Sequence, residues 1–247
     1  MYRGLIIDPP FFEIGPKAYL FGKEVLRLAE HADKISQQYR VQIIFTPQYV
    51  DIPIIASRTK NILVFAQHMD SLSIGRGVGS VLPEAIKEAG AKGVLLNHSE
   101  RPLSLDEIEK TIVRADEVGL ATMVCADTLE NVAAVARLSP NILLAETPEL
   151  IGTGKRDDTD QSAIPKINEI VWGIDPEIRV LHGAGITNGS DVYDIIASGA
   201  QGTGSTSGII KASEPYLMLE EMISSVRQAW DTTHKEEVWR QSDVCLP

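Results

Sequence analysis

Chemically reactive side chains follow several short apolar segments of this sequence. Glu146 ends one such segment and is followed at once by residues 147–154, which contain two glycines. Lys17 follows another segment, and His98 and Glu100 follow a third. Carboxyl and imidazole groups act as general acids and bases, and an ammonium group stabilises developing negative charge. Each residue alone could be a surface charge or a structural residue, so their shared position is what indicates an acid–base site.

Two glycine-bearing segments follow the last two apolar segments of the chain. They are "GAGI" at Gly183–Ile186 and "STSG" at Ser205–Gly208. Glycine lets the main chain approach a ligand closely, and backbone N–H groups at helix N-termini bind anions. These segments therefore predict a phosphate site beside the acid–base residues.

The elements that must position these residues alternate regularly along the chain. The apolar segments are Phe11–Ile14, Val41–Thr46, Ile62–Ala66, Gly93–Asn97, Ala121–Ala126, Ile142–Glu146, Ile178–His182 and the glycine-rich Gly202–Thr206. Amphipathic stretches separate them, so we expect parallel strands covered by helices. Eight such units fit a closed (β/α)8 barrel of the α/β class, in which functional residues lie at the carboxyl ends of the strands. A doubly wound open sheet is the alternative.

One barrel domain can use nearly all 247 residues. We expect residues 1–10 to form an N-terminal appendage and residues 232–247 to form a C-terminal tail. A first strand at Gly4–Asp8 is an alternative start. Ser104 is placed to cap a helix, because its hydroxyl can accept a hydrogen bond from a free backbone N–H group. In that helix Ile108, Ile112 and Ala115 recur at helical spacing.

Composition excludes several classes of protein. The formal net charge is −11, which argues against nucleic-acid binding, because that binding requires Lys and Arg to neutralise phosphates. We find no apolar stretch long enough to cross a membrane and no signal peptide. The two cysteines, Cys125 and Cys245, lie far apart in the sequence and form no disulfide framework. We therefore expect a cytoplasmic protein without nucleic-acid or membrane partners.

Four motifs carry a resemblance to a known family. "NHSERP" (97–102), "ETPELIGTG" (146–154), "HGAGIT" (182–187) and "VLPEAIKEAG" (81–90) resemble triosephosphate isomerases, particularly the short archaeal branch. The likeness extends from about Phe11 to Trp230. It implies an aldose–ketose isomerase of glycolysis and gluconeogenesis that uses neither cofactor nor metal. It also implies a small phosphorylated sugar as substrate, and a homodimer or homotetramer.

The resemblance implies roles for four residues in catalysis. Glu146 is similar to the base that removes a proton from the carbon next to the substrate carbonyl. His98 is similar to the neutral imidazole that hydrogen-bonds the enediolate oxygens, and we expect a helix N-terminus to keep it uncharged. Lys17 matches the lysine that attracts the phosphate and stabilises the enediolate. Glu100 matches the acid that orders this lysine.

The same resemblance assigns the phosphate site and a lid. Residues 147–154 match a mobile loop that closes over the substrate, in which Gly152 donates its N–H group to the phosphate. Gly185, Ser207 and Gly208 match the remaining phosphate-binding backbone. Outside the site, the resemblance implies a subunit-contact role for His68 and a buried thiol for Cys125.

Three positions depart from the family pattern. Gly15 stands where the family has an asparagine that contributes to the oxygen-binding site, Thr147 replaces a hinge proline, and Val78 replaces a threonine that reaches the neighbouring subunit. Loss of the asparagine removes a hydrogen-bond donor and is expected to leave room above Gly15. Two alternatives therefore stay open: an isomerase of a four- or five-carbon sugar phosphate, and a catalytically degraded barrel that only binds phosphosugars.

Overall fold

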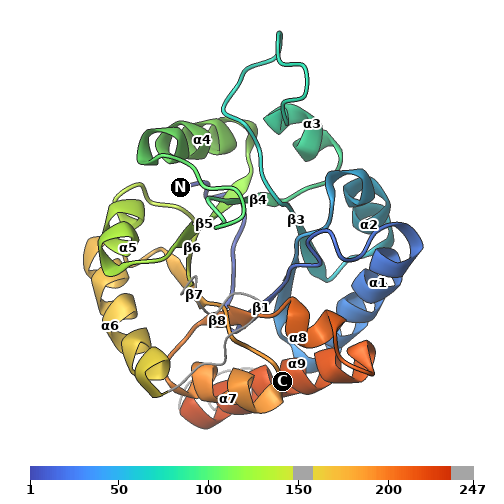
Figure 1. The fold of residues 1–247 in the computed structure, drawn as a ribbon, viewed down its shortest axis with the longest axis vertical. Coiled ribbons are helices and arrows are strands. Elements are labelled where there is room, and N and C mark those ends of the chain that lie inside the picture. The colour runs from blue at the N-terminus through green and yellow to red at the C-terminus, as the bar shows by residue number, and fades with distance from the viewer. Residues whose placement is uncertain (147–157, 235–247) are drawn as a thin grey trace, which may run out of the picture.

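The computed structural model describes residues 1–146 and 158–234. Eight parallel strands in these residues form a closed barrel in which each strand pairs with its neighbour in sequence and β1 also pairs with β8 (Figure 1). The strands are β1 (Phe11–Ile14), β2 (Gln42–Phe45), β3 (Ile62–Ala66), β4 (Gly93–Leu96), β5 (Ala121–Ala126), β6 (Ile142–Ala145), β7 (Arg179–His182) and β8 (Gly202–Gly204). The (β/α)8 barrel is therefore confirmed, and the open-sheet alternative is wrong.

Helices surround the barrel on its outer face (Figure 1). They are α1 (Gly22–Tyr39), α2 (Ile52–Arg58), α3 (Pro83–Glu88), α4 (Leu105–Val118), α5 (Leu129–Ala136), α6 (Asp158–Ile174), α7 (Gly189–Ala197), α8 (Ser207–Ile210) and α9 (Pro215–Thr233), with a 3-10 turn at Tyr49–Asp51. None of the helices in the described residues is long and apolar enough to cross a membrane. Ser104 caps α4 as predicted, because its hydroxyl accepts a hydrogen bond from the N–H group of Glu107.

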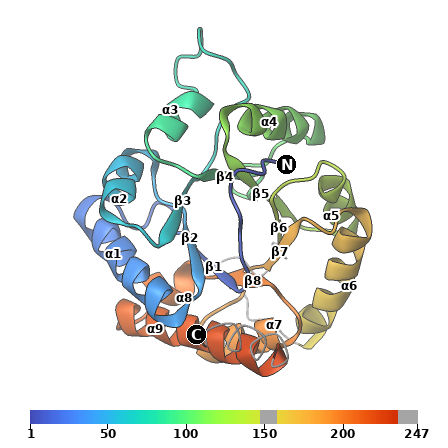
Figure 2. The ribbon, with the colours of Figure 1, turned by 180° about the vertical axis from the view of Figure 1, so that it is seen from behind.

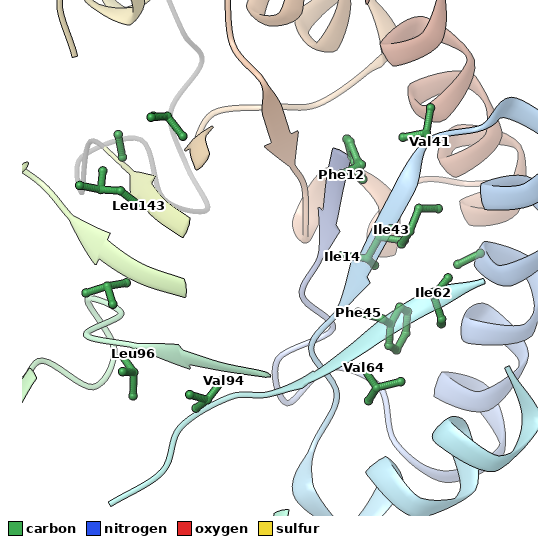
Figure 3. Close-up of a cluster of buried hydrophobic side chains, with 14 of the residues drawn as sticks. Phe12, Ile14, Val41, Ile43, Phe45, Ile62, Val64, Val94, Leu96 and Leu143 are labelled. Carbon is green, nitrogen blue, oxygen red and sulfur yellow. The ribbon is translucent and has the colours of Figure 1, made fainter. Parts of the chain in front are cut away.

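Side chains of each strand alternate between two layers of the core, since successive residues of a strand point to opposite faces. Phe12 and Ile14 join the outer layer, which packs the strands against the helices (Figure 3). Phe11 joins the inner layer, which fills the barrel with side chains from β2, β3, β5, β6 and β7 as well. The same alternation directs Glu13 toward the barrel interior, and Glu146 follows Ile142 and Leu144 on the interior face of β6.

Residues 1–10 cross the amino end of the barrel (Figure 2). Ile7 is buried in the inner layer, and Tyr2 and Leu5 pack against that layer. The amino group of Met1 forms an ion pair with Asp116 of α4 at 2.8 Å. No strand forms at residues 4–8, and β1 begins at Phe11. The N-terminal segment thus closes the end of the barrel opposite the strand termini that carry the candidate residues.

Candidate active site

A cavity of about 480 Å³ opens at the carboxyl ends of the strands. Most of the residues predicted from the sequence line it, although they come from positions far apart in the chain. The predicted residues in its wall are Lys17, His98, Glu100, Glu146, Gly185 and Ser207. Parallel closure of the barrel brings them together, because every strand ends at the same rim.

Lys17 is held in an unusual backbone conformation directly after β1. Its φ angle is 48°, in the left-handed region that few non-glycine residues adopt. The side-chain amides of Gln48 and Gln67 both donate hydrogen bonds to its carbonyl oxygen, each at 3.1 Å. Its Nζ atom forms an ion pair with Oε1 of Glu100 at 2.6 Å. Such strain persists only where neighbouring groups hold it, and it commonly marks functional positions.

His98 is held as a neutral imidazole. Its Nδ1 atom accepts a hydrogen bond from the backbone N–H group of Glu100 at 3.1 Å, so the neutral ring carries its proton on Nε2. Burial lowers the pKa of His98, and the positive charge of Lys17 lowers it further. The expected helix N-terminus is absent at this place, because the residues after His98 form a turn and α4 begins only at Leu105. The turn supplies the backbone N–H group instead.

Glu146 follows β6 and faces His98 across the cavity. Its Oε2 atom lies 3.9 Å from Nε2 of His98 and accepts no hydrogen bond from any described residue. Burial raises the pKa of Glu146 to about 7, while the charge of Lys17 opposes this rise and that of Glu100 adds to it. A carboxylate that has lost its water and has few hydrogen bonds is a stronger base than one in solvent. Glu146 therefore has the basicity and the position of a general base.

Glu13 is a residue of this cavity that the sequence analysis missed. It lies on the interior face of β1 and lines the cavity wall. Its Oε1 atom accepts a hydrogen bond from the hydroxyl of Thr46 at 2.6 Å. Burial raises the pKa of Glu13 to about 7; the charge of Glu146 also raises it, whereas Thr46 and Lys17 lower it. The available signal was a charged residue inside the otherwise apolar strand "FFEI".

The room expected above Gly15 is not there. A Cβ atom built on Gly15 would lie 2.9 Å from Oε1 of Glu13 and 3.2 Å from the hydroxyl oxygen of Thr206. The absence of a side chain at position 15 leaves no free space, because the carboxyl group of Glu13 from β1 occupies it. Glycine at position 15 is what allows Glu13 to occupy this part of the cavity.

The predicted phosphate residues lie at the rim after β7 and β8. Ala184 and Gly185 both have left-handed backbone, with φ angles of 66° and 71°. Ser207 begins α8 and lines the cavity, whereas Gly208 does not. A Cβ atom on Gly208 would lie 2.6 Å from the carbonyl oxygen of Ile186, so this glycine permits close packing of α8 against the loop after β7. Gly152 lies outside the described residues.

Comparisons with known proteins show which family the chain belongs to. The family model of triosephosphate isomerase matches residues 16–226. The chain belongs to the triosephosphate isomerase family. The triosephosphate isomerase of Methanobacterium bryantii is 41% identical over 224 residues, which cover 90% of this chain and 99% of that protein. The triosephosphate isomerase of Sulfurisphaera tokodaii is 41% identical over 231 residues, which cover 91% and 99%. These relatives support the archaeal-type branch of the family.

A crystal structure of triosephosphate isomerase from Bartonella henselae shares the fold. Its TM-score is 0.70 at 18% sequence identity, and the match covers 90% of this chain and 100% of that chain.

Among family features outside the acid–base residues, Cys125 is a buried free thiol as expected. His182 is buried, and its Nε2 atom lies 2.9 Å from Oδ1 of Asn168. His68 lines the cavity and lies 3.2 Å from Asp70, and its subunit-contact role stays a prediction. In the described part of the chain, no group of three or more His, Cys, Asp or Glu side chains is placed to hold a metal ion.

Proposed function

We propose that this protein interconverts glyceraldehyde 3-phosphate and dihydroxyacetone phosphate through an enediolate. Glu146 removes a proton from the carbon next to the carbonyl and returns it to the neighbouring carbon. The Nε2–H group of His98 donates to the substrate oxygens as negative charge moves onto them. Lys17 balances that charge, and Glu100 positions Lys17 through their ion pair at 2.6 Å. Preorganised donors of this kind stabilise an oxyanion because they need not reorganise during the reaction.

The phosphate of the substrate binds at the rim after β7 and β8 in this proposal. Gly185 and Ser207 line that side of the cavity, and Gly208 shapes it by allowing α8 to approach. Gly152, within the predicted lid, adds a backbone donor. Closure of a lid would exclude water and so protect a phosphorylated enediolate from side reactions.

The observation that carries this proposal is the pairing of Glu146 with His98. A carboxylate without a hydrogen bond at Oε2 lies 3.9 Å from an imidazole held neutral by a backbone N–H group. A barrel that only bound phosphosugars would gain nothing from such a base. The four- or five-carbon substrate was favoured by the room expected above Gly15, and Glu13 fills that room.

The test is the turnover of purified protein, free of the host isomerase, with glyceraldehyde 3-phosphate. We expect Glu146→Gln to lower kcat by roughly 10²- to 10⁴-fold, because the amide cannot take up the proton. Glu130→Gln, on the exposed surface of α5, is the matched control and should behave as wild type. Equal turnover by wild type and Glu146→Gln would contradict the proposal.

We also propose that the chain acts as a single-domain homodimer or homotetramer in the cytoplasm. The family model spans most of the chain, and the first residues pack onto the barrel. The buried, unpaired Cys125 suits a reducing compartment. The segment between β3 and α3 projects beyond the ring of helices (Figure 1), and such a projection is an argument for a contact with another subunit.

A further inference from the structure

Glu13 and Glu146 lie at the same level of the barrel, on opposite sides of a floor made by two glycines. Glu13 pairs with Gly204 of β8, and the registers of β6, β7 and β8 place Gly183 between Gly204 and Glu146. A Cβ atom on Gly204 would lie 3.1 Å from Oε2 of Glu13, and one on Gly183 would lie 2.8 Å from Oε1 of Glu146. Each carboxyl group therefore lies over the glycine of the neighbouring strand, Glu13 over Gly204 and Glu146 over Gly183, and these two glycines separate the carboxyl groups.

The two oxygen atoms of Glu13 have different surroundings. Oε1 accepts the hydrogen bond of the Thr46 hydroxyl, and this hydroxyl carries a single proton. Oε2 has no hydrogen-bond or ion-pair partner among the described residues. Glu13 is only partly buried, because it lines the cavity. Oε2 is therefore available to a ligand bound there.

Electrostatic repulsion determines the protonation state of Glu13 when the substrate is bound. The proposed reaction brings a phosphate and the ionised Glu146 into one small cavity, and the negative charge of Glu146 passes to the enediolate when Glu146 takes up the proton. A second ionised carboxylate would repel both the phosphate and this transferred charge, whereas a protonated carboxyl group is neutral and has one O–H donor. Lys17 is already paired with Glu100, so it offsets only part of this negative charge. Binding of the anionic substrate thus favours the proton on Glu13.

We propose that Glu13 is a catalytic residue, and that its protonated carboxyl group donates a hydrogen bond from Oε2 to the substrate oxygens on which negative charge develops. This inference rests on the proposed isomerase function and extends it. The productive enzyme holds one proton on the two carboxyl groups, on Glu13 and not on Glu146. The charge of Glu146 contributes to the raised pKa of Glu13, so ionisation of one carboxyl group disfavours ionisation of the other, and the active form exists over a limited range of pH.

The decisive experiment compares kcat/KM from pH 5.5 to 9.5 for wild type, Glu13→Gln and Glu13→Ala. The glutamine side chain keeps an N–H donor at the same place and does not titrate. We expect Glu13→Gln to stay within about tenfold of wild type at pH 7, and to lose the alkaline fall of activity caused by ionisation of Glu13. Glu13→Ala removes the donor and should lower kcat/KM by roughly 10²-fold or more.

Two results would overturn the role of Glu13. If Glu13→Gln were as impaired as Glu13→Ala, with an unchanged melting temperature, the carboxyl group would be acting in its ionised form or transferring a proton. If both variants kept the wild-type rate and pH profile, Glu13 would not contact the reacting atoms. Failure of the isomerase proposal would be seen separately, because the wild type would then show no turnover, or a turnover that Glu146→Gln leaves unchanged.

A binding measurement tests Glu13 even without turnover. Glycerol 3-phosphate carries the phosphate but has no carbonyl group, so it cannot form an enediolate. Titration calorimetry in buffers of different ionisation enthalpy gives the protons taken up on binding. We expect uptake at pH 7.5 by Glu146→Gln and none by Glu13→Gln/Glu146→Gln. Equal uptake by the two proteins would contradict protonation of Glu13 by ligand binding.

Discussion

At the scale of single residues, burial sets the chemistry of this cavity. It raises the pKa of Glu13 and Glu146 and lowers that of His98, because each charged form loses contact with water. The sequence predicted Glu146, His98 and Lys17 from their places at strand ends and from the family motifs. It did not reveal Glu13, because the strand "FFEI" indicates only that one side chain faces inward, not whether a cavity lies there.

Glu13 should cost the protein stability at alkaline pH. Folding raises its pKa from 4.5 to about 7, so the folded state binds this proton more tightly than the unfolded state. The contribution of Glu13 is therefore favourable at low pH and is lost as pH rises from about 4.5 through 7. We expect Glu13→Gln to be more stable than wild type at pH 8, on the order of 2 kcal/mol, and to show a smaller difference at pH 5.

Urea unfolding at the two pH values measures this difference. Glu130→Gln serves as the control. Because Glu130 is exposed on α5, this variant should have nearly the same free energy of unfolding as wild type at both pH values. A Glu13→Gln variant that is less stable than wild type at pH 8 would show that the ionised carboxylate is stabilised by its neighbours and not penalised by burial.

At the scale of elements, the strands were the most predictable part of the molecule. Each predicted apolar segment contains one observed strand, and the bounds differ by two residues at most. Continuous apolar segments and capping residues such as Ser104 act locally, so a sequence records them. Contacts between strands are not recorded in this way. The glycine floor under the two carboxyl groups depends on the register of β6, β7, β8 and β1, which only the closed barrel fixes.

The floor can be tested at Gly183. A Cβ atom there would lie 2.8 Å from Oε1 of Glu146, which is the end of a flexible side chain and can move away. We expect Gly183→Ala to fold but to displace the carboxyl group, and a misplacement of about 1 Å can lower kcat by roughly 10²-fold. Gly173→Ala is the matched control, because a Cβ atom on Gly173 in α6 meets nothing within 4 Å.

Kinetics and thermal melting of the two alanine variants separate the possibilities. A large loss of kcat with a melting temperature near that of wild type supports the displacement of Glu146. An unchanged kcat for Gly183→Ala would show that the carboxyl group reaches its working position without the glycine.

At the scale of the whole molecule, one loop extends away from the barrel. Residues 67–82 connect β3 to α3; His68 and Met69 at the start of this loop are buried, and the loop then projects beyond the ring of helices and returns to α3 (Figure 1). Asp70 ties the two ends of this projection together, because its backbone N–H group donates to the carbonyl oxygen of Val81 and its carboxylate accepts from the N–H group of Val81. The tip exposes Ile74 and Val78, at 76% and 108% of their full accessible surface. These exposed apolar side chains support the proposed contact with another copy of the chain.

Replacement of Val78 tests this contact directly. Val78→Asp places a charge where the proposed interface removes water, and burying an unpaired charge is costly. We expect wild type to elute as a multiple of the 27.0 kDa chain and Val78→Asp to shift toward the monomer, with light scattering giving the mass. Val113→Asp, at a 52% exposed position on α4, should leave the mass unchanged.

A monomeric wild type would contradict the proposed oligomer, and an unchanged oligomer in Val78→Asp would place the subunit contact elsewhere. If the monomer also loses turnover, the projection of one copy supports the cavity of another; if it keeps turnover, the cavity is complete within a single chain.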